Sequence, residues 1–418
     1  MTSPTCMNCR GSSVETFIDL GRQPNGNLFL PESELANEPT FPLEMAVCTD
    51  CWQVQIAEFP SQEFLFSDHP YLTGVNKPVV EHFNALAPHI AAKLGLGPGD
   101  LVLDIGCNDG TFLDAFRTAD IDTLGIDPGE RVVGRARDKG HEVIRGFFNE
   151  QSARKIRDAG HAPKLITAAA VFYHVPDLHD FISGLDVLMD DRTVFVAQCV
   201  SMRDLMEKLE FDHFYHEHSC IHSVGALHRL FAQHGMRLLD VEHYDIHGGS
   251  FVAYVVRDGF DKQTAPTVEE AMAKERADGL ESIEAYHAFA RDVRSNMDEL
   301  KAQLERIKAE GRTVYGLGAP LKGSTLLNYA DIGPDLVEVL TEVNPYKIDL
   351  LSPGTHIPVV DESKLEKQPD YYLVLAWNFA PFLVQKYADY LETGGKFIVP
   401  VPRTRIVGAE AVAGGFKL

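Results

Sequence analysis

Apolar and polar positions follow different periods in different parts of the chain. From about residue 80, short apolar runs such as LVLDIG, DTLGID and TVFVAQCV alternate with stretches of helical period. This alternation predicts a parallel β-sheet that is covered by helices. Residues 262–310 show a charged helical pattern with few glycines, and after Gly311 the alternation begins again with TVYGLGAPL, YYLVLAW and KFIVPV. The pattern therefore predicts an α/β protein with a doubly wound core, a helical connection and a second, smaller α/β unit.

The N-terminal part contains two pairs of cysteines instead of such a pattern. Cys6 and Cys9 form the first CxxC pair, and Cys48 and Cys51 form the second. Two pairs can supply four thiolates to a tetrahedral zinc ion, and a full set of four leaves no open position for catalysis. We expect structural zinc here, with free surface thiols as the alternative. The predicted organisation is a zinc-binding module over residues 1–75, the core over 76–260, the helical connection over 261–310 and a C-terminal domain over 311–418.

The charge balance excludes two classes of partner. The chain has 38 Lys and Arg against 61 Asp and Glu, which is a formal net charge of −23. Such an excess of negative charge repels a phosphate backbone and an anionic membrane surface. No apolar run reaches the roughly 20 residues that a transmembrane helix needs, and the N-terminus has no basic and apolar signal segment. We therefore expect a cytoplasmic protein that binds neither nucleic acid nor membrane, with its cysteines as thiols or metal ligands.

A glycine-containing loop follows the first predicted strand of the core. The segment LVLDIGCNDGTFL places Asp104 at the strand end, Gly106 and Gly110 in the loop, and a helix start after them. Glycines let the backbone approach a ligand at the carboxyl end of a strand, where open α/β sheets bind their ligands. The G-x-x-x-G spacing differs from that of dinucleotide sites and favours a cofactor without a pyrophosphate. Asp127, at the end of the next strand, can accept hydrogen bonds from two ribose hydroxyls. A purely structural turn is the alternative.

This loop, together with GIDP, resembles the S-adenosylmethionine loop of class I, Rossmann-like methyltransferases. The resemblance implies S-adenosylmethionine as the cofactor. It places the ribose diol on Asp127 and the adenine near Phe148 or Asn149. The residues implied to contact the rest of the cofactor are Asp104, Gly106, Asn108 and Gly110.

A wider set of motifs covers nearly the whole chain. The paired CxxC module with DLGRQPNGNLF, HVPD at 174–177, FDHFYHEH, HGGS at 247–250, KGSTLLNY, NPYK and PGTHIPV together resemble the sugar C-methyltransferases of deoxysugar and antibiotic biosynthesis. The resemblance implies three domains: a zinc module, a methyltransferase core and a C-terminal Rossmann-like α/β domain. It also implies methyl transfer to carbon 3 of a nucleotide-linked 4-keto-6-deoxysugar, with dTDP as the expected nucleotide.

The stretch FDHFYHEHSC contains several ionisable side chains in one row. In an extended segment Tyr215 would share one face with Glu217, and His216 would share the other with His218, whereas in a helix all four would spread around most of the circumference. Carbon becomes a nucleophile beside a ketone only after a proton leaves, and a largely neutral histidine suits that base.

The resemblance assigns a role to most of this row. It implies that His218 is the base, and that Tyr215 and Glu217, on the opposite face, orient the sugar or hold the imidazole tautomer. His174 or Tyr215 would then stabilise the enolate oxygen. A polar loop is one alternative, and a metal site from His216, Glu217 and His218 is another, although consecutive residues rarely converge on one ion.

A second glycine loop, YGLGAPLKGSTLLNY, precedes a predicted helix in the C-terminal domain. Backbone amides at a helix start and an ammonium group form an anion site, which the diphosphate of the substrate would need. The candidate residues are Gly316, Gly318, Lys322, Gly323 and Ser324, with a structural turn as the alternative. His247 precedes a glycine pair that gives a ligand access to the backbone, with a hairpin turn as the alternative. The other expected substrate contacts are Tyr71 and His216.

Two positions depart from the family's pattern. Ala170 stands where an asparagine is common, and Gln198 stands where a glutamate is common. Both neighbour the expected sugar ring, so the substituents at carbon 2 or 3 are left open. Two other functions are also open: an O- or N-methyltransferase for a small molecule, and a non-catalytic zinc-ribbon scaffold that binds nucleotide sugars.

Overall fold

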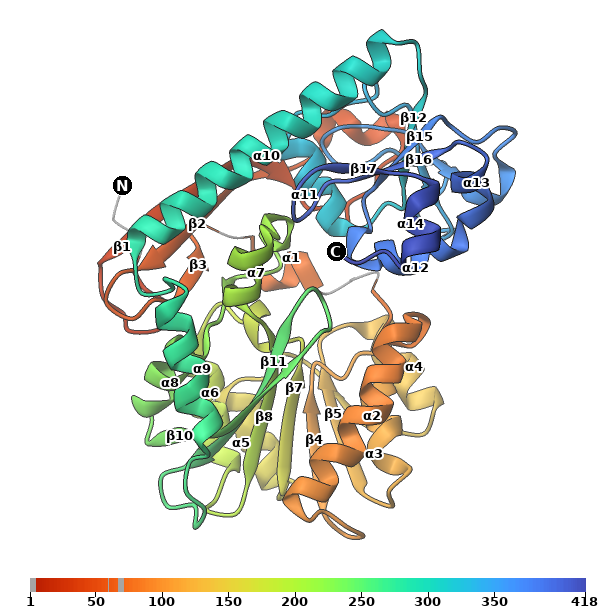
Figure 1. The fold of residues 1–418 in the computed structure, drawn as a ribbon. Coiled ribbons are helices and arrows are strands. Elements are labelled where there is room, and N and C mark those ends of the chain that lie inside the picture. Colours follow the sequence, from red (N-terminus) through yellow and green to blue (C-terminus); the bar gives the residue numbers. More distant parts are fainter. Residues whose placement is uncertain (1–4, 59, 67–70) are drawn as a thin grey trace.

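The structure is a computed structural model that describes residues 5–58, 60–66 and 71–418 (Figure 1). Within these residues three β-sheets form, one in each domain. In Figure 1 the N-terminal sheet and the C-terminal domain lie beyond the same end of the large central sheet, and one long helix runs along both of them. The three domains therefore meet above the carboxyl ends of the central strands.

The N-terminal sheet is antiparallel and has the order β1-β2-β3-β9. Its strands are β1 (Val14–Pro24), β2 (Thr40–Cys48), β3 (Val54–Ile56) and β9 (Cys220–Ile221), and the 3-10 helix η1 (Glu32–Asn37) follows β1. Strand β9 lies far along the chain and pairs with β3 through Val54↔Ile221 and Gln55↔Cys220. The zinc-binding module is thus joined directly to the segment that follows the FYHEH row.

The central sheet has the order β10-β11-β8-β7-β4-β5-β6. Its strands are β4 (Leu101–Ile105), β5 (Asp122–Asp127), β6 (Glu142–Arg145), β7 (Leu165–Ala169), β8 (Val194–Val200), β10 (Met236–Tyr244) and β11 (Ser250–Arg257). Strands β4 to β8 are parallel, whereas β11 pairs antiparallel with β8 and with β10. A doubly wound sheet of this kind was predicted from the alternation of apolar runs, and the structure confirms it.

Helices cover both faces of this sheet because successive strand residues point to opposite sides. In β4, Val102 belongs to an apolar cluster with Phe83 and Phe112, while Leu103 belongs to the cluster that contains Phe181. The helices of the domain are α2 (Lys77–Leu94), α3 (Thr111–Arg117), α4 (Glu130–Asp138), α5 (Glu150–Asp158), α6 (Leu178–Leu188), α7 (Met202–Lys208) and α8 (Val224–Ala232). Shorter elements are α1 (Gln62–Phe66), η2 (Thr73–Val75), η3 (Phe172–His174) and η4 (Phe211–His213).

Two helices, α9 (Pro266–Ala277) and α10 (Ile283–Ala309), form the connection. Helix α10 has 27 residues, so it is about 40 Å long. Its buried residues recur at helical spacing, and Tyr286 and Phe289 pack against Phe17 of β1. Toward its other end α10 contacts β12, so one helix braces both outer domains.

The C-terminal sheet has the order β14-β13-β12-β15-β16-β17, and only β17 pairs antiparallel among these described strands. Its strands are β12 (Val314–Leu317), β13 (Leu340–Glu342), β14 (Val359–Asp361), β15 (Tyr371–Val374), β16 (Lys396–Val399) and β17 (Arg405–Val407). Its helices are α11 (Leu321–Tyr329), η5 (Glu362–Lys364), η6 (Trp377–Phe379), α12 (Ala380–Lys386), α13 (Ala388–Glu392) and α14 (Ala409–Gly414). Across the described part of the chain, none of the helices combines the length and the apolar character needed to cross a membrane.

Candidate active site

The four cysteines of the N-terminal module come together as the sequence predicts. One sulfur from each lies within 4.8 Å of the others, with Cys6 Sγ 3.5 Å from Cys51 Sγ and Cys9 Sγ 3.6 Å from Cys48 Sγ. Both knuckles turn in the same way, because the residues after Cys9 and Cys51 have φ values of +61°. Four converging thiols from two such knuckles are the donor set of a tetrahedral structural zinc site. The module binds zinc through these cysteines.

The glycines of the loop after β4 have left-handed backbone conformations, and Gly106 packs closely against the protein itself. Gly106 and Gly110 have φ values of +68° and +78°, and a Cβ on Gly106 would lie 2.5 Å from Val171. The carboxylate of Asp127 accepts hydrogen bonds from the backbone N–H groups of Asn108, at 2.9 Å, and Gly129, at 2.8 Å. Asp127 therefore holds the loop that follows β4 to the end of β5.

Other predicted cofactor residues also have partners inside the protein. Asp104 is buried and accepts a hydrogen bond from Thr167 Oγ1 at 2.6 Å, and burial raises its pKa to about 7. Phe148 packs edge-on against Phe181, and the Asn149 side chain caps α5 by accepting from Ser152 N at 2.8 Å. Contact of Phe148 or Asn149 with adenine stays a prediction.

Asn108 and the neighbouring Asp109 connect the cofactor loop to the segment that carries Tyr71. The Asn108 side chain accepts from Thr73 N at 2.9 Å and donates to the Tyr71 carbonyl at 3.3 Å, while Asp109 accepts from Gly74 N at 3.0 Å. Tyr71 is 41% exposed. These bonds place Tyr71 beside the loop that follows β4, and its contact with the substrate stays a prediction.

The FYHEH row forms a turn, so the extended geometry considered for it is wrong. The N–H of His218 donates to the Tyr215 carbonyl at 2.8 Å, which closes the turn. As a result the Tyr215 ring lies against His218, with centroids 3.8 Å apart, instead of on the opposite face. The turn is held in place because η4 directly precedes the row and β9, which pairs with β3, follows it.

His218 is 2% exposed and has one fixed tautomer. Its Nδ1 lies 2.7 Å from the His213 carbonyl, and because a carbonyl can only accept, Nδ1 carries the proton. Nε2 is then the unprotonated nitrogen, and it has no hydrogen-bond partner among the described residues. Burial, together with His174 and His213, holds the pKa of His218 well below its ordinary value. The neutral imidazole can therefore accept a proton at Nε2.

His174 contacts the row, whereas the side chains of Glu217 and His216 contact the N-terminal module. His174 Nδ1 donates to the Glu217 carbonyl at 2.6 Å, and the His174 ring lies 5.0 Å from that of His218. Glu217 Oε1 accepts from Asn27 at 2.9 Å, and His216 Nε2 donates to the Pro42 carbonyl at 3.1 Å. His216, Glu217 and His218 thus point to different partners, and the described residues offer the four cysteines as their one metal-binding cluster.

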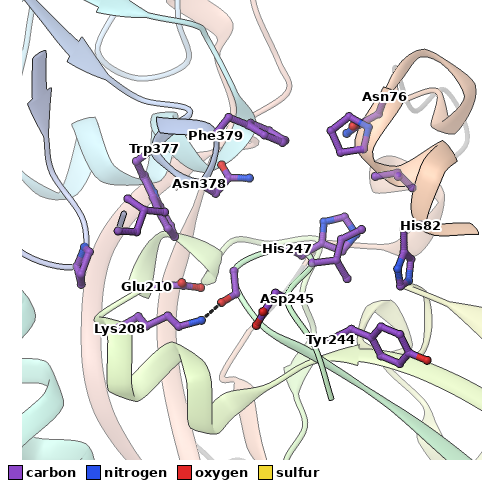
Figure 2. A pocket seen from close by; sticks show the side chains of 16 residues that line it. Asn76, His82, Lys208, Glu210, Tyr244, Asp245, His247, Trp377, Asn378 and Phe379 are labelled. Atoms are coloured by element: carbon purple, nitrogen blue, oxygen red, sulfur yellow. Dashed lines mark hydrogen bonds between the residues drawn. The ribbon is translucent and has the colours of Figure 1, made fainter. Parts of the chain in front are cut away.

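A cavity of about 540 Å³ lies between the central and C-terminal domains. Figure 2 shows Trp377 and Phe379 of the C-terminal domain on one side and His82, Tyr244 and His247 of the central domain on the other. His247 has a φ of +56° in the turn between β10 and β11, so the hairpin alternative describes its backbone correctly. Burial lowers the pKa of His247 to about 4. His247 therefore presents a neutral ring to the cavity.

Gln198, near the carboxyl end of β8, contacts His82 of the cavity wall. Its Oε1 accepts from His82 Nε2 at 2.7 Å, which sets the orientation of the amide. Its buried Nε2 has no hydrogen-bond partner among the described residues. Ala170, the other position that departs from the family's pattern, follows β7 and donates its N–H to the Gln198 carbonyl. The two departures are therefore adjacent.

Lys322, expected at an open anion loop, lies instead against other protein groups. Its ammonium sits 3.7 Å from the centroid of Trp377, close to the carboxylates of Asp212 and Glu210, and burial lowers its pKa. Trp377 Nε1 donates to Asp212 Oδ2 at 2.6 Å.

The rest of this loop also packs inside the protein. Ser324 Oγ donates to the Gly26 carbonyl at 3.3 Å, and Glu342 accepts from Ala319 N at 3.1 Å. A Cβ on Gly316 would lie 2.4 Å from Leu340, one on Gly323 would lie 3.1 Å from Leu375, and Gly318 has a φ of +81°. The diphosphate assignment stays a prediction, and these contacts favour a structural role for the loop.

Sequence reasoning missed Glu210, Asp212, His213 and Trp377. The first three stand in EFDH, directly before the FYHEH row, so the clustering of charge could have identified them. Trp377 is one of two tryptophans but lies 165 residues from Asp212, its hydrogen-bond partner, and no local pattern joins them.

The fold and these features define a class of protein: a class I, S-adenosylmethionine-dependent methyltransferase with an added zinc module. Comparison with family models finds a putative zinc binding domain at residues 6–66, a methyltransferase domain at 80–241 and a C-methyltransferase C-terminal domain at 245–402. The curated C-methyltransferase NovU of Streptomyces niveus is 32% identical over 408 residues, which are 97% of each chain. The chain therefore belongs to the C-methyltransferase family, and it is an enzyme.

Solved structures resemble only part of the chain. Magnesium protoporphyrin IX methyltransferase of Synechocystis PCC 6803 has 17% identity and a TM-score of 0.33, and the match covers 43% of this chain and 79% of that one. The PH0226 protein of Pyrococcus horikoshii OT3 has 14% identity and a TM-score of 0.37, with coverage of 48% and 100%. Family membership rests on the match to NovU and the three family models, and it favours carbon over the oxygen or nitrogen acceptors considered above.

Proposed function

We propose that the enzyme methylates carbon 3 of a nucleotide-linked 4-keto-6-deoxysugar, with dTDP as the nucleotide, after His218 removes the proton beside the ketone. The observation that carries the proposal is the tautomer of His218, whose Nδ1 donates to the His213 carbonyl and leaves Nε2 as a buried acceptor. A C-methyltransferase needs such a base, because a carbon beside a ketone attacks only after it loses a proton.

The proposed reaction has two steps. First, the C–H bond at carbon 3 breaks, the proton moves to His218 Nε2, and the electron pair is delocalised onto the ketone oxygen as an enolate. Second, carbon 3 would form a bond to the methyl group of S-adenosylmethionine as the methyl–sulfonium bond breaks, its electron pair stays on sulfur and S-adenosylhomocysteine leaves. The proton on His218 is then released to solvent. The residues proposed to line the cofactor are Asp104, Gly106, Asn108, Gly110 and Asp127, with Phe148 and Asn149 near the adenine.

Tyr215 is the better donor to the enolate oxygen. Burial raises its pKa well above the ordinary value, so its hydroxyl stays protonated and can donate. His174 already uses its Nδ1 proton on the Glu217 carbonyl, so in the neutral form its Nε2 carries no proton to give. We therefore assign the enolate contact to Tyr215, and we assign to His174 and Glu217 the support of the turn that holds His218. A cytoplasmic location would keep the four cysteines reduced and available to zinc.

Solvent exchange tests this proposal directly. With S-adenosylhomocysteine bound and dTDP-4-keto-6-deoxyglucose in D₂O, the wild-type enzyme should exchange the carbon 3 proton, as followed by NMR. His218→Asn should lower the exchange rate by about a hundred- to ten-thousandfold, and Tyr215→Phe by less. His161→Asn is the control and should exchange at the wild-type rate, because His161 lies before the start of β7, at the amino end of the parallel strands, where it pairs with Glu142. Exchange by His218→Asn at the wild-type rate would show that His218 is not the base.

A further inference from the structure

Glu210 is a buried acid in the wall of the cavity between the central and C-terminal domains (Figure 2). Its side chain is 1% exposed, and its buried Oε2 has no hydrogen-bond partner within the described residues. His213 Nε2 lies 3.7 Å from Glu210 Oε2, which is beyond hydrogen-bond range. Buried polar groups are almost always satisfied, so an exception in a cavity wall points to a ligand.

The turn after His247 packs tightly against the carboxylate of Glu210. A Cβ on Gly248 would lie 2.1 Å from Glu210 Oε2, so only glycine allows the turn after His247 to press against the acid. Gly248 has a φ of +94°, and Leu209, directly before Glu210, has a φ of +54°. Unfavourable backbone conformations of this kind persist where the surrounding structure demands them, often at binding sites.

Glu210 lies close to the proposed base, His218. The His213 ring is stacked on the His218 ring, with centroids 6.1 Å apart, and His213 also faces Glu210. One side chain thus separates Glu210 from the proposed base. The part of the acceptor that lies nearest to Glu210 is therefore the sugar.

The charges of the cavity agree with a sugar ring and disfavour a diphosphate. Lys208 is the one Lys or Arg among the described lining residues, and its ammonium donates to the Gly248 carbonyl. Besides Glu210, the acid Asp245 and several aliphatic residues, the wall is formed by aromatic and neutral polar side chains, which is typical of a small-molecule cavity with a few polar groups. Burial raises the pKa of Glu210 to about 8, opposed by Lys322 and Lys208, so a donor group on the ligand would favour the carboxylate.

We propose that Glu210 is a substrate-binding residue, and that its carboxylate accepts a hydrogen bond from a hydroxyl group of the sugar ring. The proposal rests on the proposed function, because it assumes that the acceptor is a sugar. It assigns to the HGGS turn the task of positioning this acid.

Binding measurements on the full chain test the proposal. With S-adenosylhomocysteine bound, we compare by calorimetry the affinities for dTDP-4-keto-6-deoxyglucose and for dTDP alone. Glu210→Gln should weaken the sugar nucleotide on the order of ten- to hundredfold and leave dTDP unchanged. Glu275→Gln is the matched control: Glu275 is another buried acid, 6% exposed, whose carboxylate accepts from the backbone N–H groups of Val224 and Gly225 and does not line the cavity. It should leave both affinities unchanged.

The possible results separate this proposal from the proposed function. Equal affinity of Glu210→Gln and wild type for the sugar nucleotide, or an equal loss for both ligands, would overturn the assignment of Glu210 to the sugar. If the wild type binds the sugar nucleotide and Glu210→Gln weakens it, but no carbon 3 proton exchanges, Glu210 keeps its role and the proposed chemistry fails. No binding by the wild type would overturn both. Unchanged affinity for S-adenosylhomocysteine shows that each variant is folded.

Discussion

At the scale of the residue, a single backbone carbonyl decides what His218 can do. The neutral imidazole of a histidine can carry its proton on either nitrogen, and the His213 carbonyl at 2.7 Å selects Nδ1. The open nitrogen is then Nε2. The position of the base therefore depends on η4. Asp212 of η4 accepts a hydrogen bond from Trp377, which belongs to the C-terminal domain.

The lowered pKa of His218 predicts the pH dependence of proton exchange. A base must be unprotonated, and the pKa of His218 lies well below the ordinary 6.5 because of burial and the nearby His174 and His213. The exchange rate at carbon 3 should thus stay constant as the pH falls from 8 to 6.5 and decrease only below that. The rate is measured by NMR in buffers from pH 5 to 8. A midpoint at or above pH 6.5 would contradict the assignment.

At the scale of the element, helix α10 joins the two outer domains. Phe289 is 4% exposed and packs against both Phe17 of the zinc module and Phe214 of the row that carries His218. The helix is amphipathic, so its function as a brace depends on one buried stripe.

Truncation of this stripe should destabilise the protein. Phe289→Ala removes a buried ring and should lower the free energy of unfolding by about 3–5 kcal/mol. Glu299→Ala, at an exposed position of the same helix, is the control and should change it by less than about 0.5 kcal/mol. Urea denaturation followed by circular dichroism measures both. Similar values for the two variants would show that α10 is not a brace.

At the scale of the whole molecule, the zinc module forms part of the wall behind the active site. Strand β3 pairs with β9, Asn27 binds Glu217, and His216 binds the Pro42 carbonyl. A structural zinc ion therefore affects the reaction indirectly, through contacts such as these between the zinc module and the central domain.

Zinc content and removal can be measured independently. Elemental analysis should give about one zinc per chain, and less than half an equivalent would contradict the four-thiolate site. Removal by a chelator should lower Tm by at least about 10 °C, because binding of a structural zinc contributes folding free energy. Proton exchange should slow as the module loosens, while the affinity for S-adenosylhomocysteine should change little, since the cofactor loop belongs to the central sheet. If the affinity for S-adenosylhomocysteine fell as much as the exchange rate, zinc removal would disturb the central domain as well as the zinc module.

Local patterns were sufficient to predict the elements and the cysteine cluster. Alternating apolar runs indicated both α/β sheets, and the CxxC spacing indicated the cluster of Cys6, Cys9, Cys48 and Cys51. The loop between Asp104 and Gly110 was recognisable from its glycines, and its contacts with the cofactor stay a prediction. These features depend on residues close in the chain or on the period of a single strand or helix, so the amino-acid sequence contains them directly.

Tertiary structure alone decided how the row and the second glycine loop are used. The extended geometry failed because β9 and η4 hold residues 215–218 in a turn, which no residue of the row specifies by itself. The surroundings of Lys322 depend on Asp212 and Trp377, which lie on different domains. The cavity with Glu210 exists only where those domains meet. Sequence patterns report which chemistry is present, but contacts between distant residues decide which groups become buried, and burial determines their charge, tautomer and partners.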